Sequence, residues 1–368
     1  MKGEVIIIYL DHAATTPTCQ AAKEIIMKHI DDFGNPSSSH ELGRQARVLI
    51  EDARERIAKC INANPDEIYF TSGGSEANSW VARNYITVTS NFEHHSMKAQ
   101  LNNVWIDSNG FIKTQFFRHI NHSLAGCFDL GSCMYVNNEI GTIQPIKDVE
   151  RAMHSKGMLF HTDAVQAVGH IPVDVKDLNC DMLSASAHKF GGIKGAGFLY
   201  VKNGIGFKPL INGGSQEQHK RGGTENILGI LAMAAALEDS VEHMEERNEH
   251  VKHLRDKMLD RLLLIPGSYL NGSLENRVCS NINIRFDGVS GARLVTLCSL
   301  YGVYISSGSA CNEGVSKPSH VLKAIGLTDD EALSSVRITI GHTNTEQEID
   351  KAASIITQLV ERIREDNE

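Results

Sequence analysis

Ser184-Ala185-Ser186-Ala187-His188-Lys189-Phe190-Gly191-Gly192 lies near the middle of the chain, between two short apolar runs at 181–183 and 198–201. An apolar run, a turn of small residues and glycines, and a second apolar run predict a strand, a tight loop and a strand. Such a loop can hold Lys189 over a cavity, where burial and neighbouring cations lower the pKa of the amine and free it for Schiff-base chemistry. Taken alone, the stretch also fits a surface lysine in an ordinary turn.

The composition excludes several classes of protein. The chain has 368 residues, 41% hydrophobic and 22% charged, which suits a soluble globular protein with room for two domains. The net charge is −9 and the sequence shows no basic stripe that could neutralise phosphates, so direct nucleic-acid binding is not expected. The apolar run at 5–9 is too short for a membrane span and leads into Asp11, so we expect a strand there rather than a signal peptide or membrane anchor.

The cysteines indicate a reducing compartment. The eight cysteines form no Cys-x-x-Cys pair and show no zinc-ligand spacing. We therefore expect a cytoplasmic protein without a metal site.

The first two thirds of the chain alternate between strand-like and helix-like patterns. Helices are expected near 18–30, over 42–60 and from residue 75, and strands at 68–71, 85–89, 133–136, 158–161 and 181–184. This alternation predicts an α/β fold whose parallel sheet is covered on both faces.

The pattern changes in the last third. Apolar residues keep helical spacing over 237–262, which predicts one long connecting helix. Strands are expected at 278–284, 302–305 and 336–340, with a final helix over 345–363. We expect a large domain over 15–257 and a smaller α/β domain over 258–368, with residues 1–14 packing on the smaller domain.

Thr71-Ser72-Gly73-Gly74-Ser75-Glu76 lies where a predicted strand meets a predicted helix. Glycines allow a ligand to approach the backbone, and a helix N-terminus offers unpaired N–H groups to a phosphate, which the Ser75 hydroxyl could also bind. An ordinary βα turn in which Ser75 caps the helix is the alternative. The stretch is neither a Walker loop nor Gly-x-Gly-x-x-Gly, so a nucleotide is not indicated.

Two further stretches follow predicted strands. In His161-Thr162-Asp163-Ala164-Val165-Gln166, Asp163 could pair with a protonated ring nitrogen of a cofactor, or could simply cap a helix. In Glu93-His94-His95, an imidazole could stack on a cofactor ring and move protons near neutral pH, or the pair could be solvated.

Cys311 and Arg337 complete the set of candidate residues. Cys311 lies in a loop of small residues, 306–314, where an exposed thiol has the profile of a nucleophile, although such a placement also arises by chance. Arg337 stands within an apolar strand pattern, where burial requires an anion: either a substrate carboxylate or a structural ion-pair partner.

Five motifs together resemble a known family. They are SAHKFGG at 186–192, HTDAVQAVG at 161–169, NNEIG at 137–141, RGGTEN at 221–226 and SSGSAC at 306–311. In this order, and over nearly the whole chain, they resemble the cysteine desulfurases of the group I, NifS/IscS-like branch. That resemblance implies the fold-type I, class V aminotransferase-like architecture: a large domain with a mixed, mostly parallel sheet, a smaller C-terminal α/β domain, and pyridoxal 5'-phosphate (PLP) as cofactor.

The resemblance also implies a role for each matching residue. Lys189 would bind PLP covalently and move the α-proton, Cys311 would attack the substrate sulfur, and His94 would stack on the cofactor ring. Asp163 would pair with the pyridinium nitrogen and Gln166 with the ring hydroxyl. The remaining positions are Asn138 near the phenolic oxygen or the substrate, Gly74, Ser75, Ser186 and His188 around the phosphate, Thr224 at the phosphate of a partner subunit, and Arg337 at the substrate carboxylate.

The implied function is that of a homodimeric L-cysteine desulfurase. It would convert L-cysteine to L-alanine, hold the sulfur as a persulfide on Cys311 and pass it to an acceptor protein in iron–sulfur cluster, thionucleoside or cofactor biosynthesis. The alternatives are a related PLP lyase acting on selenocysteine or cysteine sulfinate, and a PLP-binding paralogue without activity. Two features depart from the family pattern: a shortened segment between His94 and Asn138, and His342 where many relatives have a second arginine.

Overall fold

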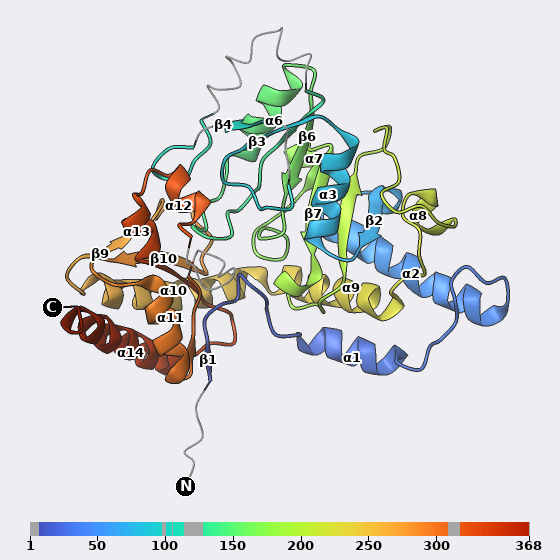
Figure 1. Ribbon diagram of the computed structural model, residues 1–368. Coiled ribbons are helices and arrows are strands. Elements are labelled where there is room, and N and C mark those ends of the chain that lie inside the picture. The colour runs from blue at the N-terminus through green and yellow to red at the C-terminus, as the bar shows by residue number, and fades with distance from the viewer. Residues whose placement is uncertain (1–6, 98–100, 105, 114–127, 308–316, 368) are drawn as a thin grey trace.

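A seven-stranded sheet forms the centre of the computed structural model, which describes residues 7–97, 101–104, 106–113, 128–307 and 317–367 (Figure 1). The strands lie in the order β2-β8-β7-β6-β5-β3-β4, and only β8 runs antiparallel to its neighbours. Their bounds are β2 Ile68–Thr71, β3 Thr87–Ser90, β4 Leu101–Val104, β5 Leu130–Ser132, β6 Leu159–Asp163, β7 Met182–Ser186 and β8 Gly197–Val201. The predicted α/β fold with a mostly parallel sheet is confirmed.

Helices cover both faces of this sheet. Successive side chains of a strand point to opposite faces, and apolar side chains on both faces must be buried. Leu183 of β7 belongs to the core cluster that contains Ile57 and Leu237, whereas the preceding residue, Met182, packs in the cluster of Trp80. The helices of the first face include α2 (Glu41–Cys60) and α9 (Ile227–Glu242), with α1 (Gln20–His29) packed along α9, and α3 (Gly74–Asn84) lies on the second face. The other elements of this part are η1 Pro65–Glu67, α6 Ile146–His154, α7 Val175–Leu178, η2 Ala187–Lys189 and α8 Gln216–His219.

A smaller unit surrounds a second core. The antiparallel strands β9 (Ser268–Leu270), β10 (Asn281–Phe286) and β12 (Ser335–Thr339) form a sheet in the order β12-β10-β9. Near the N-terminus, β1 (Ile8–Tyr9) pairs in parallel with β11 (Val303–Tyr304), and Ile8 joins the same core as Ile282 and Ile356. The helices of this unit are α10 Met244–Leu263, α11 Gly291–Leu300, α12 His320–Ala324, α13 Asp329–Leu333 and α14 Glu346–Glu365. The domain boundary at 257/258 stays a prediction.

Two predicted elements are wrong. The strand predicted at 133–136 lies three residues too late, since β5 ends at Ser132. The backbone N–H groups of Cys133 and Tyr135 still donate to the carbonyl oxygens of His161 and Asp163, so the apolar run continues the contact with β6 beyond the regular strand. The single helix expected over 237–262 is instead α9 followed by α10, which meet at His243 with φ −103° and ψ 13°. Apolar spacing continues across this junction because both helices face protein cores.

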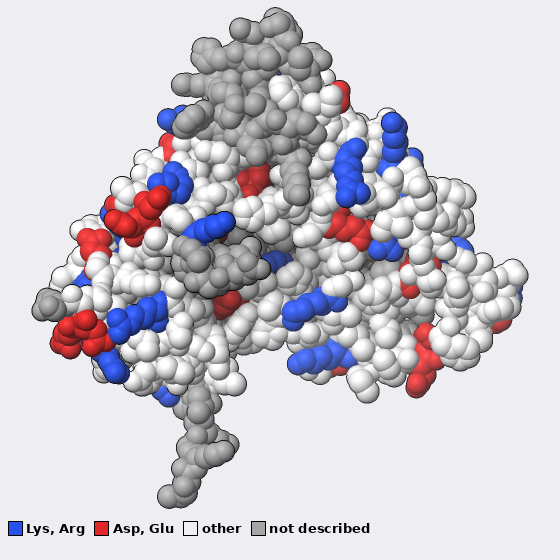
Figure 2. Space-filling view, in the orientation of Figure 1, with Lys and Arg blue, Asp and Glu red and all other residues white. Residues whose placement is uncertain are grey.

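The described part of the chain holds no helix that is both long and apolar enough to cross a membrane. On the face shown in Figure 2, acidic and basic side chains alternate among the coloured residues without a continuous area of one charge.

Candidate active site

A cavity of about 310 Å³ opens at the carboxyl ends of the parallel strands, where ligands bind in α/β sheets. β6 ends at Asp163 and β7 ends at Ser186, and both residues line the cavity. Of the predicted site residues that the structure describes, all except Thr224 lie around it. Its lining consists of Ala13, Ala14, Gly74, Ser75, Asn78, His94, Met134, Asn138, Asp163, Val165, Gln166, Ser186, His188, Lys189 and Arg337.

Lys189 ends the 3₁₀ turn η2 that follows β7. Its Nζ donates hydrogen bonds to the carbonyl oxygens of Ala13, at 2.6 Å, and Ala14, at 2.9 Å. Burial and the nearby Arg337 guanidinium lower the pKa of Lys189 to about 8, although Asp163 acts in the opposite direction. The amine is therefore much closer to its neutral, nucleophilic form at physiological pH than an ordinary lysine is.

Asp163 is buried at the end of β6 and held by two donors. Its Oδ1 accepts from the backbone N–H of Val165 at 3.0 Å, and its Oδ2 accepts from Nδ2 of Asn78 at 2.6 Å. Asp163 caps no helix, because the residues after it form turns, so the capping alternative is wrong; its carboxylate lines the cavity. Gln166 lies one turn further on, and its Nε2 donates to the Ala13 carbonyl at 2.9 Å.

The N-terminus of α3 forms one end of the cavity. Its N-cap residue is Gly73, with φ +148° and no side-chain cap, so the predicted alternative in which Ser75 caps the helix is wrong. The uncapped N–H groups of the first turn are available to an anion. A Cβ atom at Gly74 would lie 2.4 Å from Cγ2 of Val165, so the backbone approaches this wall too closely for any other residue. His188 also lines the cavity, and its Nδ1 lies 3.1 Å from Oγ1 of Thr15.

His94 follows β3; its side chain is exposed, as the solvated alternative expects, but its ring is hydrogen-bonded. Its Nδ1 lies 2.7 Å from Oγ of Ser96 and accepts from the backbone N–H of Ser96 at 3.2 Å. Partial burial, Lys189 and His95 lower the pKa of His94, and Asp163 opposes them. The neighbouring His95 turns away and packs its ring 4.6 Å from that of His320.

Arg337 forms the structural ion pair that was one of its two predicted roles, and the other role, at a substrate carboxylate, stays a prediction. Its Nη2 donates to Oδ1 of Asp11 at 2.7 Å and its Nη1 to the carbonyl oxygen of Asn138 at 2.9 Å, so a structural ion pair exists. Its buried Nε has no hydrogen-bond partner among the described residues, although the side chain lines the cavity. A carboxylate in the cavity would lie against a cation that is only partly neutralised.

The structure does not show two of the predicted residues in this cavity, for different reasons. Thr224 is exposed and does not line the cavity of its own chain, as expected of a residue that acts on a partner subunit. Cys311 lies outside the described residues. The roles assigned to the site residues stay predictions.

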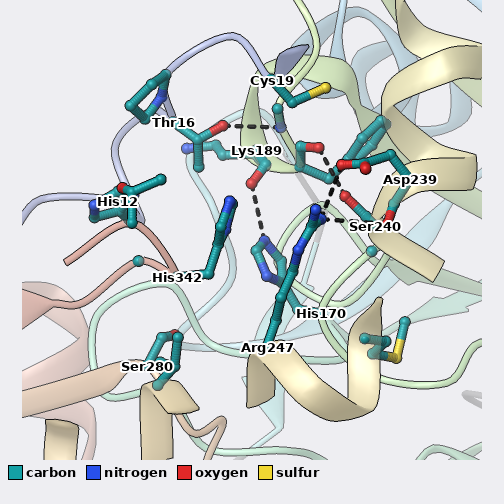
Figure 3. A pocket seen from close by; sticks show the side chains of 18 of the residues that line it. His12, Thr16, Cys19, His170, Lys189, Asp239, Ser240, Arg247, Ser280 and His342 are labelled. Atoms are coloured by element: carbon teal, nitrogen blue, oxygen red, sulfur yellow. Dashed lines mark hydrogen bonds and ion pairs between the residues drawn. The ribbon is translucent and has the colours of Figure 1, made fainter. Parts of the chain in front are cut away.

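His342 does not lie beside Arg337. It lines a second cavity of about 390 Å³ that shares Ala13, Gln166 and Lys189 with the first (Figure 3). His12 and His170 line the same cavity, and burial lowers the pKa of all three imidazoles, that of His12 to about 4. His342 is thus an imidazole of lowered pKa in the cavity that adjoins the first one.

The residues that sequence reasoning missed include Asp11, Asn78 and Ser96, whose side chains contact predicted site residues. Asp11 pairs with Arg337, and Asn78 donates to Asp163. Asn78 lies three residues after Ser75 on α3, on a buried part of the helix, and a polar residue at a buried helical position was the available signal.

The residues present fit a planar, anionic cofactor that binds covalently to an amine. The cavity offers an amine of lowered pKa, an uncapped helix N-terminus and a buried carboxylate on three separate walls. The side chain of Asn78 contributes a buried Oδ1 that has no partner in the described structure. These are the groups that a ring with an aldehyde, a phosphate and a basic nitrogen requires.

Comparisons with known proteins agree with this chemistry. Residues 8–352 match the family model described as aminotransferase class-V. A cysteine desulfurase IscS from Dictyoglomus turgidum is 40% identical over 385 residues, covering 99% of this chain and 96% of the relative. One from Methanosarcina thermophila is 37% identical, covering 97% and 93%.

Solved structures give the same result. A NifS-like protein from Rickettsia africae superposes with a TM-score of 0.88 at 30% identity, covering 98% of this chain and all of the other. Another NifS-like protein gives a TM-score of 0.87 at 33% identity, with coverage of 97% and 100%.

Proposed function

The chain belongs to the aminotransferase class-V family and is a pyridoxal-phosphate-dependent cysteine desulfurase, and we propose that the cavity around Lys189 is its active site. One observation carries this assignment. The amine of Lys189, with its pKa lowered to about 8, shares one cavity with the carboxylate of Asp163 and the guanidinium of Arg337. The reaction requires a nucleophilic amine, an anchor for a ring nitrogen and a cation for the substrate carboxylate.

We assign the cofactor contacts as follows. Lys189 holds PLP covalently, Asp163 pairs with its ring nitrogen, and His94 stacks on the ring. The uncapped N-terminus of α3 supports a phosphate position there. The other contacts assigned are Gln166 and Asn138 at the ring hydroxyl, and Gly74, Ser75, Ser186 and His188 at the phosphate.

When bound, PLP supplies a conjugated ring that stores the electron pair released at the substrate α-carbon. The protein does the rest. Arg337 binds the substrate carboxylate, and the Lys189 amine takes the α-proton, for which its lowered pKa suits it. Asp163, held by Asn78 and the Val165 N–H, keeps its carboxylate directed at the cavity.

We assign sulfur abstraction to Cys311. Its thiolate attacks the substrate sulfur, the new S–S bond forms as the Cβ–S bond breaks, and the electron pair left on Cβ takes a proton to give alanine. The outer sulfur of the persulfide then passes from Cys311 to an acceptor protein, whose identity the sequence leaves open. A reducing cytoplasm, predicted from the cysteine pattern, is the compartment in which such a thiol stays reduced.

We also propose an isologous homodimer. Thr224 is exposed and remote from its own cavity, which supports a role in the partner's phosphate site. Large apolar side chains are exposed along α1, the following loop and α2, at Met27 (72% exposed), Phe33 (84%) and Val48 (67%). These two helices extend from one end of the molecule in Figure 1. Such exposure is typical of a protein interface.

Lys189→Ala tests the assignment directly. The variant should release no alanine from L-cysteine and should yield no PLP–protein adduct after borohydride reduction, measured by mass spectrometry. Lys194→Ala, which removes an exposed lysine of the same loop, is the matched control and should behave like the wild type. An adduct that persists at another lysine in Lys189→Ala would refute the assignment.

A further inference from the structure

Four side chains form a continuous hydrogen-bonded chain along one wall of the cavity. Asn78 donates from the same Nδ2 to Oδ2 of Asp163, at 2.6 Å, and to Oγ of Ser96, at 2.9 Å. Oγ of Ser96 lies 2.7 Å from Nδ1 of His94. The chain therefore joins the carboxylate assigned to the ring nitrogen to the imidazole assigned to the ring face.

The direction of each hydrogen bond follows from the donors present. Asp163 can only accept here, so the amide of Asn78 must turn its nitrogen toward the carboxylate. The backbone N–H of Ser96 donates to Nδ1 of His94, so that nitrogen must be an acceptor. The Ser96 hydroxyl therefore donates to Nδ1, while its oxygen accepts from Asn78.

We propose that Asn78 and Ser96 are positioning residues that hold His94 as the neutral tautomer with its proton on Nε2. Nδ1 is then occupied by two donors, and the imidazole can exchange a proton with the reacting groups only at Nε2. This inference rests on the proposed role of His94 beside the cofactor.

The surroundings of His94 favour the same state. The charged and titratable groups near it are Asp163 from β6, Lys189 from η2, the adjacent His95 and His320 from α12. Of these, Lys189 and His95 add to burial in lowering the pKa of His94, and only Asp163 opposes them. Asn78 is itself 1% exposed and leaves its Oδ1 without a partner in the described structure.

The test is ¹⁵N nuclear magnetic resonance of the full-length holoenzyme with ¹⁵N-labelled histidine, with the His94 signals assigned by their loss in His94→Gln. In the wild type, Nδ1 of His94 should have the shift of an acceptor and Nε2 that of a protonated nitrogen. Ser96→Ala removes a donor that only the neutral ring can use, so the pKa of His94 should rise, with about two- to tenfold tighter proton binding. The Nδ1–H tautomer should also become populated.

Two variants make the result specific. Ser96→Thr keeps the hydroxyl and should restore the wild-type tautomer. Ser79→Ala removes a neighbouring hydroxyl of α3 that lies 3.5 Å from the backbone carbonyl of Ser96, and should leave His94 unchanged. A protonated Nδ1 in the wild type, or a His94 titration unaltered by Ser96→Ala, would overturn the proposal. The test measures the protonation of the His94 ring and not the activity. If the wild type released no alanine from cysteine, that result would count against the proposed function but not against this proposal.

Discussion

The Nζ of Lys189 donates a 2.6 Å hydrogen bond to the carbonyl oxygen of Ala13, 176 positions earlier in the chain. Gln166 donates to the same carbonyl. The segment that follows β1 thus packs against the loop that carries Lys189, and its carbonyl oxygens orient the lysine amine. Asp11, two residues before Ala13, holds Arg337, so this one segment positions two of the charged groups of the cavity.

Arg337→Gln should raise KM for L-cysteine about ten- to hundredfold, the effect of losing a hydrogen-bonded charge at the substrate carboxylate. Loss of this cation should also raise the pKa of Lys189, since Arg337 lowers it in the wild type. Steady-state kinetics over a pH series measure both effects. Arg293→Gln, which removes a surface arginine paired with Asp366, is the control. A lower unfolding temperature with unchanged KM would leave Arg337 with only its structural ion pair to Asp11.

Mixed dimers of Lys189→Ala and Thr224→Ala chains test the proposed interface. If Thr224 acts across the interface, one site of the mixed dimer combines both defects and the other has neither. The mixed dimer should then keep about half of the wild-type activity, whereas each homodimeric variant is impaired. Differently tagged chains purified by two affinity steps provide the sample. Activity no higher than that of the Thr224→Ala homodimer would place Thr224 in its own subunit's site.

Cys311→Ser should separate cofactor binding from sulfur abstraction. The hydroxyl stays protonated near pH 7 and attacks sulfur poorly, so alanine release should fall to background while PLP stays covalently bound. The wild type incubated with L-cysteine and no reductant should gain about 32 Da per added sulfur at this residue. Undiminished alanine release by Cys311→Ser would instead favour a lyase mechanism.

The buried carboxyl of Glu93 should make stability depend on pH. Burial raises the pKa of the Glu93 carboxyl from an ordinary value of 4.5 to about 8. Hydrogen bonds from Ser90 and from the Met134 N–H act in the opposite direction and lower it. The folded protein therefore binds more protons than the unfolded chain between these values. The contribution of Glu93 to the free energy of unfolding is therefore fully present below about pH 4.5 and is lost as pH rises through 8.

Glu93→Gln should remove this contribution to the pH dependence. Chemical denaturation at a series of pH values measures it as the difference in unfolding free energy between wild type and variant. That difference should shift in favour of Glu93→Gln as pH rises from 4.5 to 8. A constant difference across this range would contradict the raised pKa.

The fold class followed from the order of strand and helix patterns, and most of the cavity lining followed from the motifs that resemble the family. Strand and helix periods predicted β2, β7, α2 and α14 closely, because strongly patterned segments carry their own signal. The strand-end position of Asp163 followed from the rule that ligands bind at the carboxyl ends of parallel strands, and the loop position of Lys189 followed from the glycines between two apolar runs. Local pattern misplaced the strand at 133–136, because these residues still bond to β6 after the regular strand β5 has ended.

Tertiary structure alone decided how the site residues are held. The Asn78 bond to Asp163 joins residues 85 positions apart, and the Asp11 bond to Arg337 joins residues 326 positions apart. The spacing of residues within one helix or strand cannot predict such long-range pairs. The same holds for the placement of His342 in a second cavity rather than beside Arg337. Helix and strand periods record which face a residue presents, whereas its hydrogen-bond partner depends on which distant segments the folded core brings into contact.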